Sequence, residues 1–199
     1  MSHYFENDKD LKSKKMEFKY TFNNKEYIMK SDFGVFSKDE LDEGTAIFLN
    51  VLKEESLNGR ILDLGCGIGC LGITLASIFP ESKIEGVDVN ERALSLCNEN
   101  ILLNKINNYK VYESNICSNV KGLFNMVVTN PPIRAGKEVV FSFFSQAYNC
   151  LDLNGILYVV NRKSHGAKSS EKKLIELFGN CEILEKKKGF YILKSIKCG

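Results

Sequence analysis

A glycine-rich stretch at residues 63–72, DLGCGIGCLG, is the first part of the sequence whose residue types and spacing could do chemistry. It lies between the apolar runs RILDL and CLGITLASIF, which predicts a strand, a tight loop and a helix. Glycine allows such a turn and lets a ligand approach the backbone closely. Because Gly67, Gly69 and Gly72 match the dinucleotide pattern G-x-G-x-x-G, the loop indicates a nucleotide site, with NAD as one candidate.

An acid at the end of the preceding strand changes which nucleotide is favoured. Asp63 starts a second pattern, D-x-G-x-G-x-G, which continues through Gly65, Gly67 and Gly69. A carboxylate at this point would repel a pyrophosphate and attract a cationic group, such as the ammonium of an amino acid. We therefore expect a ligand with a cationic end, and we expect Gly72 to serve helix packing.

A second acid, Asp88, ends the next strand-like run, KIEGVDV, and is followed by Val89. A carboxylate there can accept hydrogen bonds from both hydroxyls of a ribose, which is common to several adenosine cofactors. After the third strand-like run, Asn115 and Ile116 offer an amide beside an apolar wall, which would suit an adenine ring. This last signal is weak when taken alone.

The fourth strand-like run leads directly into Asn130-Pro131-Pro132. Two prolines fix φ near −65° and keep Asn130 out of the helical region, which predicts a rigid turn at the carboxyl end of a central strand. The Asn130 side-chain carbonyl and a proline carbonyl are acceptors that could converge on one planar NH2 group. An ordinary Pro-Pro turn would explain the rigidity but not the asparagine.

The elements that must position these groups alternate between strand and helix from residue 58 onward, and the chain ends in two strand-like runs without a helix between them. This order predicts a doubly wound α/β core over residues 58–199, with a mainly parallel seven-stranded sheet and a C-terminal antiparallel hairpin. Residues 17–57 predict a small hairpin and a helix that complete a single domain over 17–199. Residues 1–16 predict a flexible, charged lead-in.

Composition narrows the possible classes. No apolar run approaches 18 residues and the N-terminus lacks an apolar core, so we expect neither a membrane span nor a secretory signal. Seven cysteines without C-x-x-C spacing suggest free thiols in the cytoplasm, and only two histidines argue against a metal site. Residues 155–199 carry ten Lys and Arg against four Asp and Glu, which is typical either of a solvated surface or of a patch for a polyanion.

Together, the D-x-G-x-G-x-G loop, the acid that closes the next strand and the Asn-Pro-Pro-Ile turn resemble the class I S-adenosylmethionine-dependent methyltransferases. Three stretches narrow the resemblance: GVFSKDELDEGT at 34–45, the segment 114–137, and KKKGFYILK near the C-terminus. They are similar to the single-domain relatives of the ribosomal RNA guanine-N2 methyltransferases of the small subunit. The resemblance covers roughly residues 17–196.

This resemblance implies S-adenosylmethionine as cofactor and a catalytic turn formed by Asn130, Pro131 and Pro132. It implies cofactor contacts from the glycine loop, from the two acids and from neighbouring groups: Asp63, Gly65, Gly67, Gly69, Asp88, Val89, Asn115, Ile116, Asn130 and Thr45. Substrate contacts are expected from Phe36, Ile133, Arg134, Lys137 and Arg162. The implied partner is ribosomal RNA or the small ribosomal subunit, bound by a cytoplasmic monomer or small homo-oligomer.

Two departures from the family keep alternatives open. The better-known members carry a second, degenerate domain for which this chain has no room, and Ile133 stands where many Asn-Pro-Pro enzymes have Phe or Tyr to stack the target base. Phe36 is the candidate to replace that ring. The alternatives are a glutamine-amide methyltransferase acting on a translation factor, a small-molecule methyltransferase, and a non-catalytic RNA-binding module.

Overall fold

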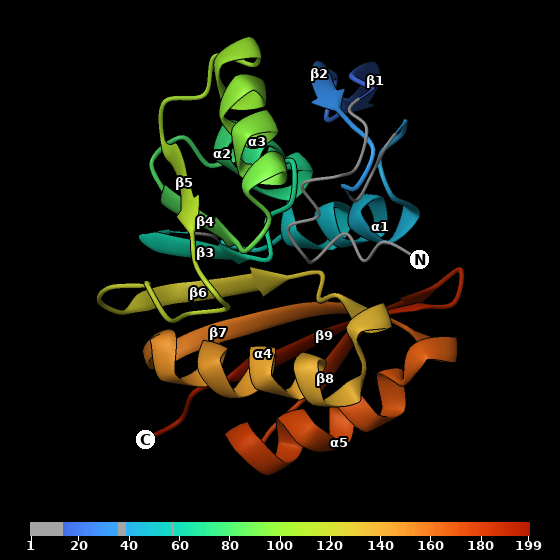
Figure 1. Ribbon diagram of the computed structural model, residues 1–199. Helices are drawn as coiled ribbons and strands as arrows, with labels where there is room; N and C mark the ends of the chain where they lie inside the picture. Colours follow the sequence, from blue (N-terminus) through green and yellow to red (C-terminus); the bar gives the residue numbers. More distant parts are fainter. Residues whose placement is uncertain (1–13, 36–38, 57) are drawn as a thin grey trace.

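The computed structural model describes residues 14–35, 39–56 and 58–199, which form three layers with a twisted sheet between two sets of helices (Figure 1). The sheet has seven strands in the order β5-β4-β3-β6-β7-β9-β8. Strands β3 to β7 run parallel, and β9 lies antiparallel between β7 and β8. The predicted seven-stranded, mainly parallel sheet with a C-terminal antiparallel hairpin is therefore confirmed.

The strands of the sheet are β3 (Arg60–Leu64), β4 (Lys83–Asp88), β5 (Tyr109–Glu113), β6 (Phe124–Thr129), β7 (Leu151–Arg162), β8 (Glu182–Lys187) and β9 (Phe190–Ile196). The chain first builds outward from β3 to β5, then returns to place β6 on the other side of β3. In open α/β sheets, ligands bind outside the carboxyl ends of the strands at such a reversal. The fold therefore places the site beside the ends of β3 and β6.

Helices α1 (Glu43–Leu52), α2 (Cys70–Ile78) and α3 (Glu91–Leu103) cover one face of the sheet. Helices α4 (Lys137–Cys150) and α5 (Ala167–Phe178) cover the other face. Alternate strand residues point into two separate apolar clusters, since Ile61 packs with the first set of helices and Leu62 with the second. Burial on both faces is what fixes the register of the central strands.

A separate hairpin of β1 (Met16–Phe22) and β2 (Lys25–Ser31) packs on α3, as the sequence predicted for a small N-terminal extension. Of the predicted lead-in, residues 1–13 lie outside the described part of the chain, and β1 begins at Met16. The hairpin is fastened by the side-chain amides of Asn100 and Asn104. Each amide accepts a hydrogen bond from a backbone N–H of β2 and donates one to the carbonyl of that same residue, which is Lys30 for Asn100 and Ile28 for Asn104.

Candidate cofactor and substrate pocket

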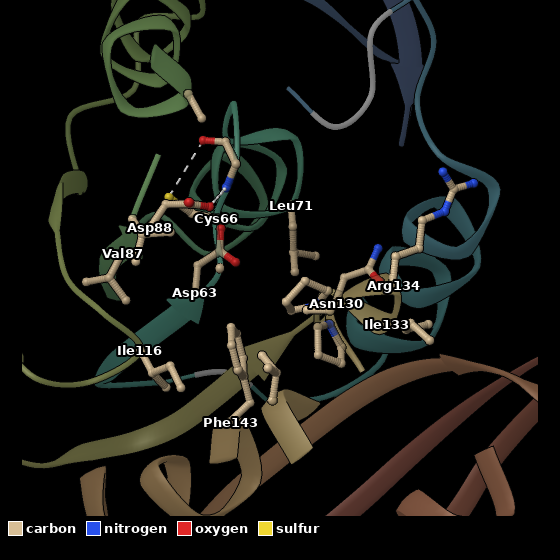
Figure 2. A pocket seen from close by; sticks show the side chains of 18 of the residues that line it. Asp63, Cys66, Leu71, Val87, Asp88, Ile116, Asn130, Ile133, Arg134 and Phe143 are labelled. Atoms are coloured by element: carbon tan, nitrogen blue, oxygen red, sulfur yellow. Dashed lines mark hydrogen bonds between the residues drawn. The ribbon is translucent and has the colours of Figure 1, made fainter. Parts of the chain in front are cut away.

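A cavity of about 940 Å³ opens at the carboxyl ends of β3, β4 and β6 (Figure 2). This volume lies at the upper end of the range for small-molecule sites, so it can hold a cofactor and part of a second substrate. Most of the residues predicted for the site lie in its wall: Thr45, Asp63, Gly65, Gly67, Asp88, Val89, Asn115, Ile116, Asn130, Pro131, Pro132, Ile133, Arg134 and Arg162.

Three predicted residues are not among those that line the cavity. Gly69 lies in the glycine loop but behind its inner surface, and Lys137 begins α4 with its ammonium group 5.1 Å from the centre of the Phe141 ring. Phe36, the predicted stacking ring, lies outside the described residues.

The glycine loop adopts the left-handed backbone that the sequence pattern requires, with φ of 77°, 54° and 91° at Gly65, Gly67 and Gly69. The two last glycines serve different needs. A Cβ at Gly67 would meet no atom within 4 Å, so this residue faces open space in the pocket wall. A Cβ at Gly69 would lie 2.4 Å from the sulfur of Cys97, so this glycine makes room for packing against α3. The cradle at Gly67 fits the close approach of a nucleotide cofactor.

Asp63 lies at the end of β3 with 1% of its surface exposed, and its Oδ2 accepts a hydrogen bond from the hydroxyl of Tyr109 at 3.0 Å. Tyr109 fills the space that side chains at Gly72 and Gly86 would occupy. A Cβ at Gly72 would lie 2.3 Å from the ring carbon Cζ of Tyr109, and a Cβ at Gly86 would lie 2.3 Å from its hydroxyl oxygen. The expectation that Gly72 serves packing is therefore confirmed. Burial raises the pKa of Asp63 to about 7, because desolvation outweighs the hydrogen bonds from Tyr109 and the Gly72 backbone.

Asp88, at the end of β4, links the glycine loop to the start of α3. Its carboxylate accepts hydrogen bonds from the backbone N–H groups of Gly67 and Asn90, both at 2.9 Å, the first of which is dashed in Figure 2. Burial raises the pKa of this carboxyl, against these hydrogen bonds. Each oxygen keeps a lone pair, so the group can still accept hydroxyl donors from a ribose.

The wall predicted for an adenine ring has an unusual backbone. Ile116 adopts φ of 52°, which is rare for a β-branched residue and costs on the order of 1–3 kcal/mol. Such strain is concentrated at functional sites, because the surrounding structure must hold it in place. Phe143 of α4 belongs to the same apolar cluster and also lines the cavity, so it adds an aromatic face to this wall.

The Asn130-Pro131-Pro132 turn lies at the end of β6, next to the end of β3. Thr129 holds the two strand ends together, since its hydroxyl donates to the Leu64 carbonyl at 2.7 Å. The Asn130 Nδ2 lies 3.2 Å from Thr45 Oγ1 and 3.4 Å from Asp42 Oδ2, both at the start of α1. The described fold thus brings Asn130 and the Asp63 loop into one cavity.

Arg162 ends β7, the strand beside β6, and Phe190 begins β9, where the two residues pair across the sheet. The guanidinium group of Arg162 lies 4.7 Å from the centre of the Phe190 ring, which fixes the charge at the pocket. Arg134 is exposed in the short 3-10 turn η1 (Ile133–Ala135) that follows the prolines. Positive charge therefore lies just after the Asn130-Pro131-Pro132 turn and at the end of β7.

Sequence reasoning did not single out Asp42, Tyr109, Phe143 or Phe190. Asp42 had a signal, because it stands three residues before Thr45 as an N-cap would, and it does cap α1. Tyr109, Phe143 and Phe190 occupy ordinary apolar positions of strands and a helix. Only the packing of distant segments brings Phe143 and Phe190 to the pocket and places the Tyr109 hydroxyl against Asp63.

Within the part of the chain that the structure describes, no three His, Cys, Asp or Glu side chains gather as metal ligands would. No helix in the same residues is long and apolar enough to cross a membrane.

The sheet order, the acidic strand ends and the turn after β6 together define a class I S-adenosylmethionine-dependent methyltransferase. The chain belongs to the family described as "Methyltransferase small domain", whose model matches residues 26–194. The methyltransferase fold and the cofactor S-adenosylmethionine expected from the sequence are those of this family.

Three similar proteins illustrate the relationship. "Uncharacterized protein YbxB" of Bacillus subtilis (strain 168) is 43% identical over 98% of both chains. "Ribosomal RNA small subunit methyltransferase C" of Erwinia tasmaniensis is 31% identical, over 86% of this chain and 50% of its own length. A solved T. thermophilus 16S rRNA N2 G1207 methyltransferase, in complex with AdoMet and guanosine, superposes with a TM-score of 0.83 at 24% identity, over 92% of this chain and 50% of its own. This chain thus spans about half the length of both ribosomal RNA methyltransferases.

Proposed function

We propose that this protein transfers a methyl group from S-adenosylmethionine to an exocyclic amino group, namely guanine N2 in RNA of the small ribosomal subunit. The observation that carries the proposal is the Asn130-Pro131-Pro132 turn, which shares one cavity with Asp63 and Asp88. The choice of ribosomal RNA of the small subunit is supported by two relatives that are ribosomal RNA methyltransferases, and the choice of guanine N2 by one of them, the T. thermophilus enzyme.

In this proposal the residues around the glycine loop hold the cofactor. Asp63, Gly65 and Gly67 take the amino-acid end, Gly69 shapes the loop that carries them, and Thr45 contributes from α1. Asp88 and Val89 take the ribose. Asn115 and Ile116 take the adenine. Once bound, the cofactor supplies a methyl group on a sulfonium, which is an excellent leaving group.

The Asn130 turn would hold the target nitrogen. An exocyclic amino group is conjugated with its ring and is a poor nucleophile. Hydrogen bonds from its two N–H groups to the Asn130 Oδ1 and the Pro131 carbonyl favour a pyramidal nitrogen whose lone pair is free to attack. The main contribution to catalysis is to hold the amino nitrogen and the methyl group in line, and such positioning can lower the activation barrier by about 7–11 kcal/mol. The spare proton leaves the cationic nitrogen after transfer.

RNA would be held by the charged rim of the pocket. Arg134, Lys137 and Arg162 are the proposed phosphate contacts, with Ile133 packing on the target base. Stacking of a base on an aromatic ring contributes about 1–3 kcal/mol, which Ile133 does not supply. Phe36 remains the proposed ring, and Phe190, which lines the pocket, is a second one.

The test is transfer of a tritiated methyl group to three acceptors: undermethylated small ribosomal subunits, free ribosomal RNA and the soluble protein fraction. We expect label in N2-methylguanosine from subunits or RNA. An RNA with inosine at the labelled position should accept no methyl group, because it lacks the amino group. Label in glutamine of a protein, or no transfer to any fraction despite cofactor binding, would refute the guanine proposal.

Two variants separate the proposed roles. Asn130→Ala should lower turnover by at least about 100-fold and leave cofactor affinity within about tenfold, because it removes an acceptor of the target amine. Asp88→Ala should instead weaken cofactor binding, measured by calorimetry. Normal turnover in Asn130→Ala would show that the turn does not hold the amine.

A further inference from the structure

The Asn130 side chain can present either its carbonyl oxygen or its NH2 group to the pocket, and these choices have opposite chemical consequences. An oxygen attracts the N–H groups of a target amine, whereas an NH2 group would attract a carbonyl instead. The neighbours of the Asn130 amide at the start of α1, Asp42 and Thr45, which also line the pocket, therefore decide which substrates the turn can read.

Those neighbours are acceptors. Asp42 Oδ2 accepts three hydrogen bonds: from the Thr45 backbone N–H at 2.9 Å, the Thr45 hydroxyl at 3.3 Å and Asn130 Nδ2 at 3.4 Å. Because the Thr45 hydroxyl gives its proton to Asp42, an oxygen lone pair is left facing Asn130 Nδ2, 3.2 Å away. Both amide hydrogens of Asn130 thus have partners in α1.

The opposite orientation is unfavourable. It would place the Asn130 carbonyl oxygen beside the carboxylate of Asp42, two acceptors with no hydrogen between them. The contact of 3.4 Å is too long for a strong hydrogen bond. The contact between Asn130 and Asp42 acts through electrostatics, because the negative carboxylate oxygen at this distance attracts an amide hydrogen and repels a carbonyl oxygen. Asp42 is itself held in place, since it caps α1 and points toward Thr45.

Resting on the proposed function, we infer that Asp42 and Thr45 are positioning residues that orient the Asn130 amide, so that this side chain offers the substrate only an acceptor. The pair selects a substrate nitrogen that carries hydrogens and disfavours a carbonyl oxygen at the same point. Specificity for an amino group thus depends on the start of α1 as well as on the Asn-Pro-Pro turn.

The test compares Asp42→Asn, which keeps the shape but removes the fixed polarity, with Thr45→Val, which removes the hydroxyl. Misplacement by about 1 Å can cost about 100-fold, so we expect kcat to fall about 10- to 100-fold in both variants. In Asp42→Asn, which changes no proposed cofactor contact, the KM for S-adenosylmethionine should stay within about threefold. Thr45→Ser should recover most of the lost kcat, and Asn50→Ala on the exposed side of α1 serves as the control for helix perturbation.

A second measurement does not depend on activity. The side-chain NH2 signals of Asn130 in a ¹⁵N–¹H spectrum are identified by their loss in Asn130→Ala. Thr45→Val and Asp42→Asn should each shift these signals in a folded protein, whereas Asn50→Ala should not. If the Asn130 signals are unchanged in Thr45→Val and Asp42→Asn, the inference is overturned. This result can be read even if the protein shows no methyl transfer and the proposed function is wrong. Full kcat in both variants, or a Thr45→Val defect confined to cofactor affinity, also overturns it.

Discussion

At the scale of single residues, Asp63 has two properties that a carboxylate on the surface does not have. It is nearly inaccessible to solvent, and it accepts a hydrogen bond from the buried Tyr109 hydroxyl. Burial disfavours its charged form, so its pKa lies at about 7, well above the ordinary value of 3.8. A cationic ligand would reverse this effect by stabilising the carboxylate.

Cofactor binding should therefore depend on pH. Below its folded pKa Asp63 is protonated, so a ligand ammonium must displace that proton. Between pH 5.5 and 7 the ionised fraction rises roughly fifteenfold, and the association constant for S-adenosylmethionine should rise with it. Calorimetry in buffers of different ionisation enthalpy would count the released protons. Asp63→Asn removes this group, so the variant should release fewer protons on binding than the wild type. Binding without proton release would contradict this role of Asp63.

The raised pKa also affects stability. Because the native state holds the Asp63 proton up to about pH 7 whereas the unfolded chain loses it near 4, this group's contribution to the unfolding free energy falls as pH rises across that window.

Gly67 and Gly69 give a matched pair for separating function from packing. Gly67→Ala should fold at a cost of about 1–2 kcal/mol for its left-handed backbone, and should weaken cofactor binding because the new methyl group enters the cavity. Gly69→Ala should lose about 2–4 kcal/mol, because its methyl group meets Cys97 as well. Urea unfolding and calorimetry measure the two effects. Wild-type affinity in Gly67→Ala would show that the cofactor does not approach this glycine.

At the scale of elements, the N-terminal hairpin is attached in a way that resembles strand pairing. Asn100 and Asn104 lie one helical turn apart on α3, a rise of about 6 Å. Ile28 and Lys30, which they bind, are two residues apart on β2, a distance of about 6.7 Å. The near match lets two side-chain amides take the place of a neighbouring strand along the open edge of the hairpin. Asn100 also donates to the Ile68 carbonyl at 3.0 Å, which ties the hairpin to the glycine loop.

The variants Asn100→Ala and Asn104→Ala should therefore both be less stable for the same reason, but they should differ in their affinity for S-adenosylmethionine. Each change leaves backbone groups of β2 without partners and should lower the unfolding free energy by about 1–3 kcal/mol. Only Asn100→Ala also frees the glycine loop, so only this variant should weaken S-adenosylmethionine binding. Calorimetry at a temperature where both variants are folded would check this. Equal affinity in the two variants would show that the hairpin does not support the loop.

The sequence was informative where a feature depends on residues close along the chain. The strand that ends in Asp63, the glycine loop and the Asn-Pro-Pro turn are local patterns, and alternation of strand and helix predicted the sheet that assembles them. The hydrogen bonds of Tyr109 to Asp63 and of Asn130 to Asp42 join residues 46 and 88 positions apart. No local propensity encodes these pairings, because they depend on β5 joining the sheet beside β4 and on α1 packing next to the end of β6.

At the scale of the whole molecule, charge is divided between the two parts of the chain. The basic C-terminal part supplies Arg162 to the pocket, and at the hairpin turn that follows β8, Lys188 forms an ion pair with Glu43 of α1 at 2.7 Å. The positive charge of the last segment thus reaches the end of α1 that holds the Asn130 contacts.

RNA binding should consequently depend on salt through a small number of contacts. Each phosphate contact contributes a slope of about one in a plot of log affinity against log salt concentration. Arg134→Ala should weaken RNA binding and lower this slope by about one, and it should leave the affinity for S-adenosylmethionine unchanged. Lys19→Ala on the distant hairpin is the control. A slope that Arg134→Ala does not alter would place the RNA elsewhere.

The antiparallel insertion of β9 also affects how the protein is made. The cavity wall is collected from Val35 near the start of the chain to Phe190 near its end, and β9 enters between β7 and β8 only after both have been synthesised. A nascent chain that has emerged as far as β6 already contains Asp63, Asp88 and the Asn130 turn, but it lacks Arg162 and Phe190. The complete pocket therefore needs residues that are synthesised well after its proposed catalytic turn, as far along the chain as Phe190.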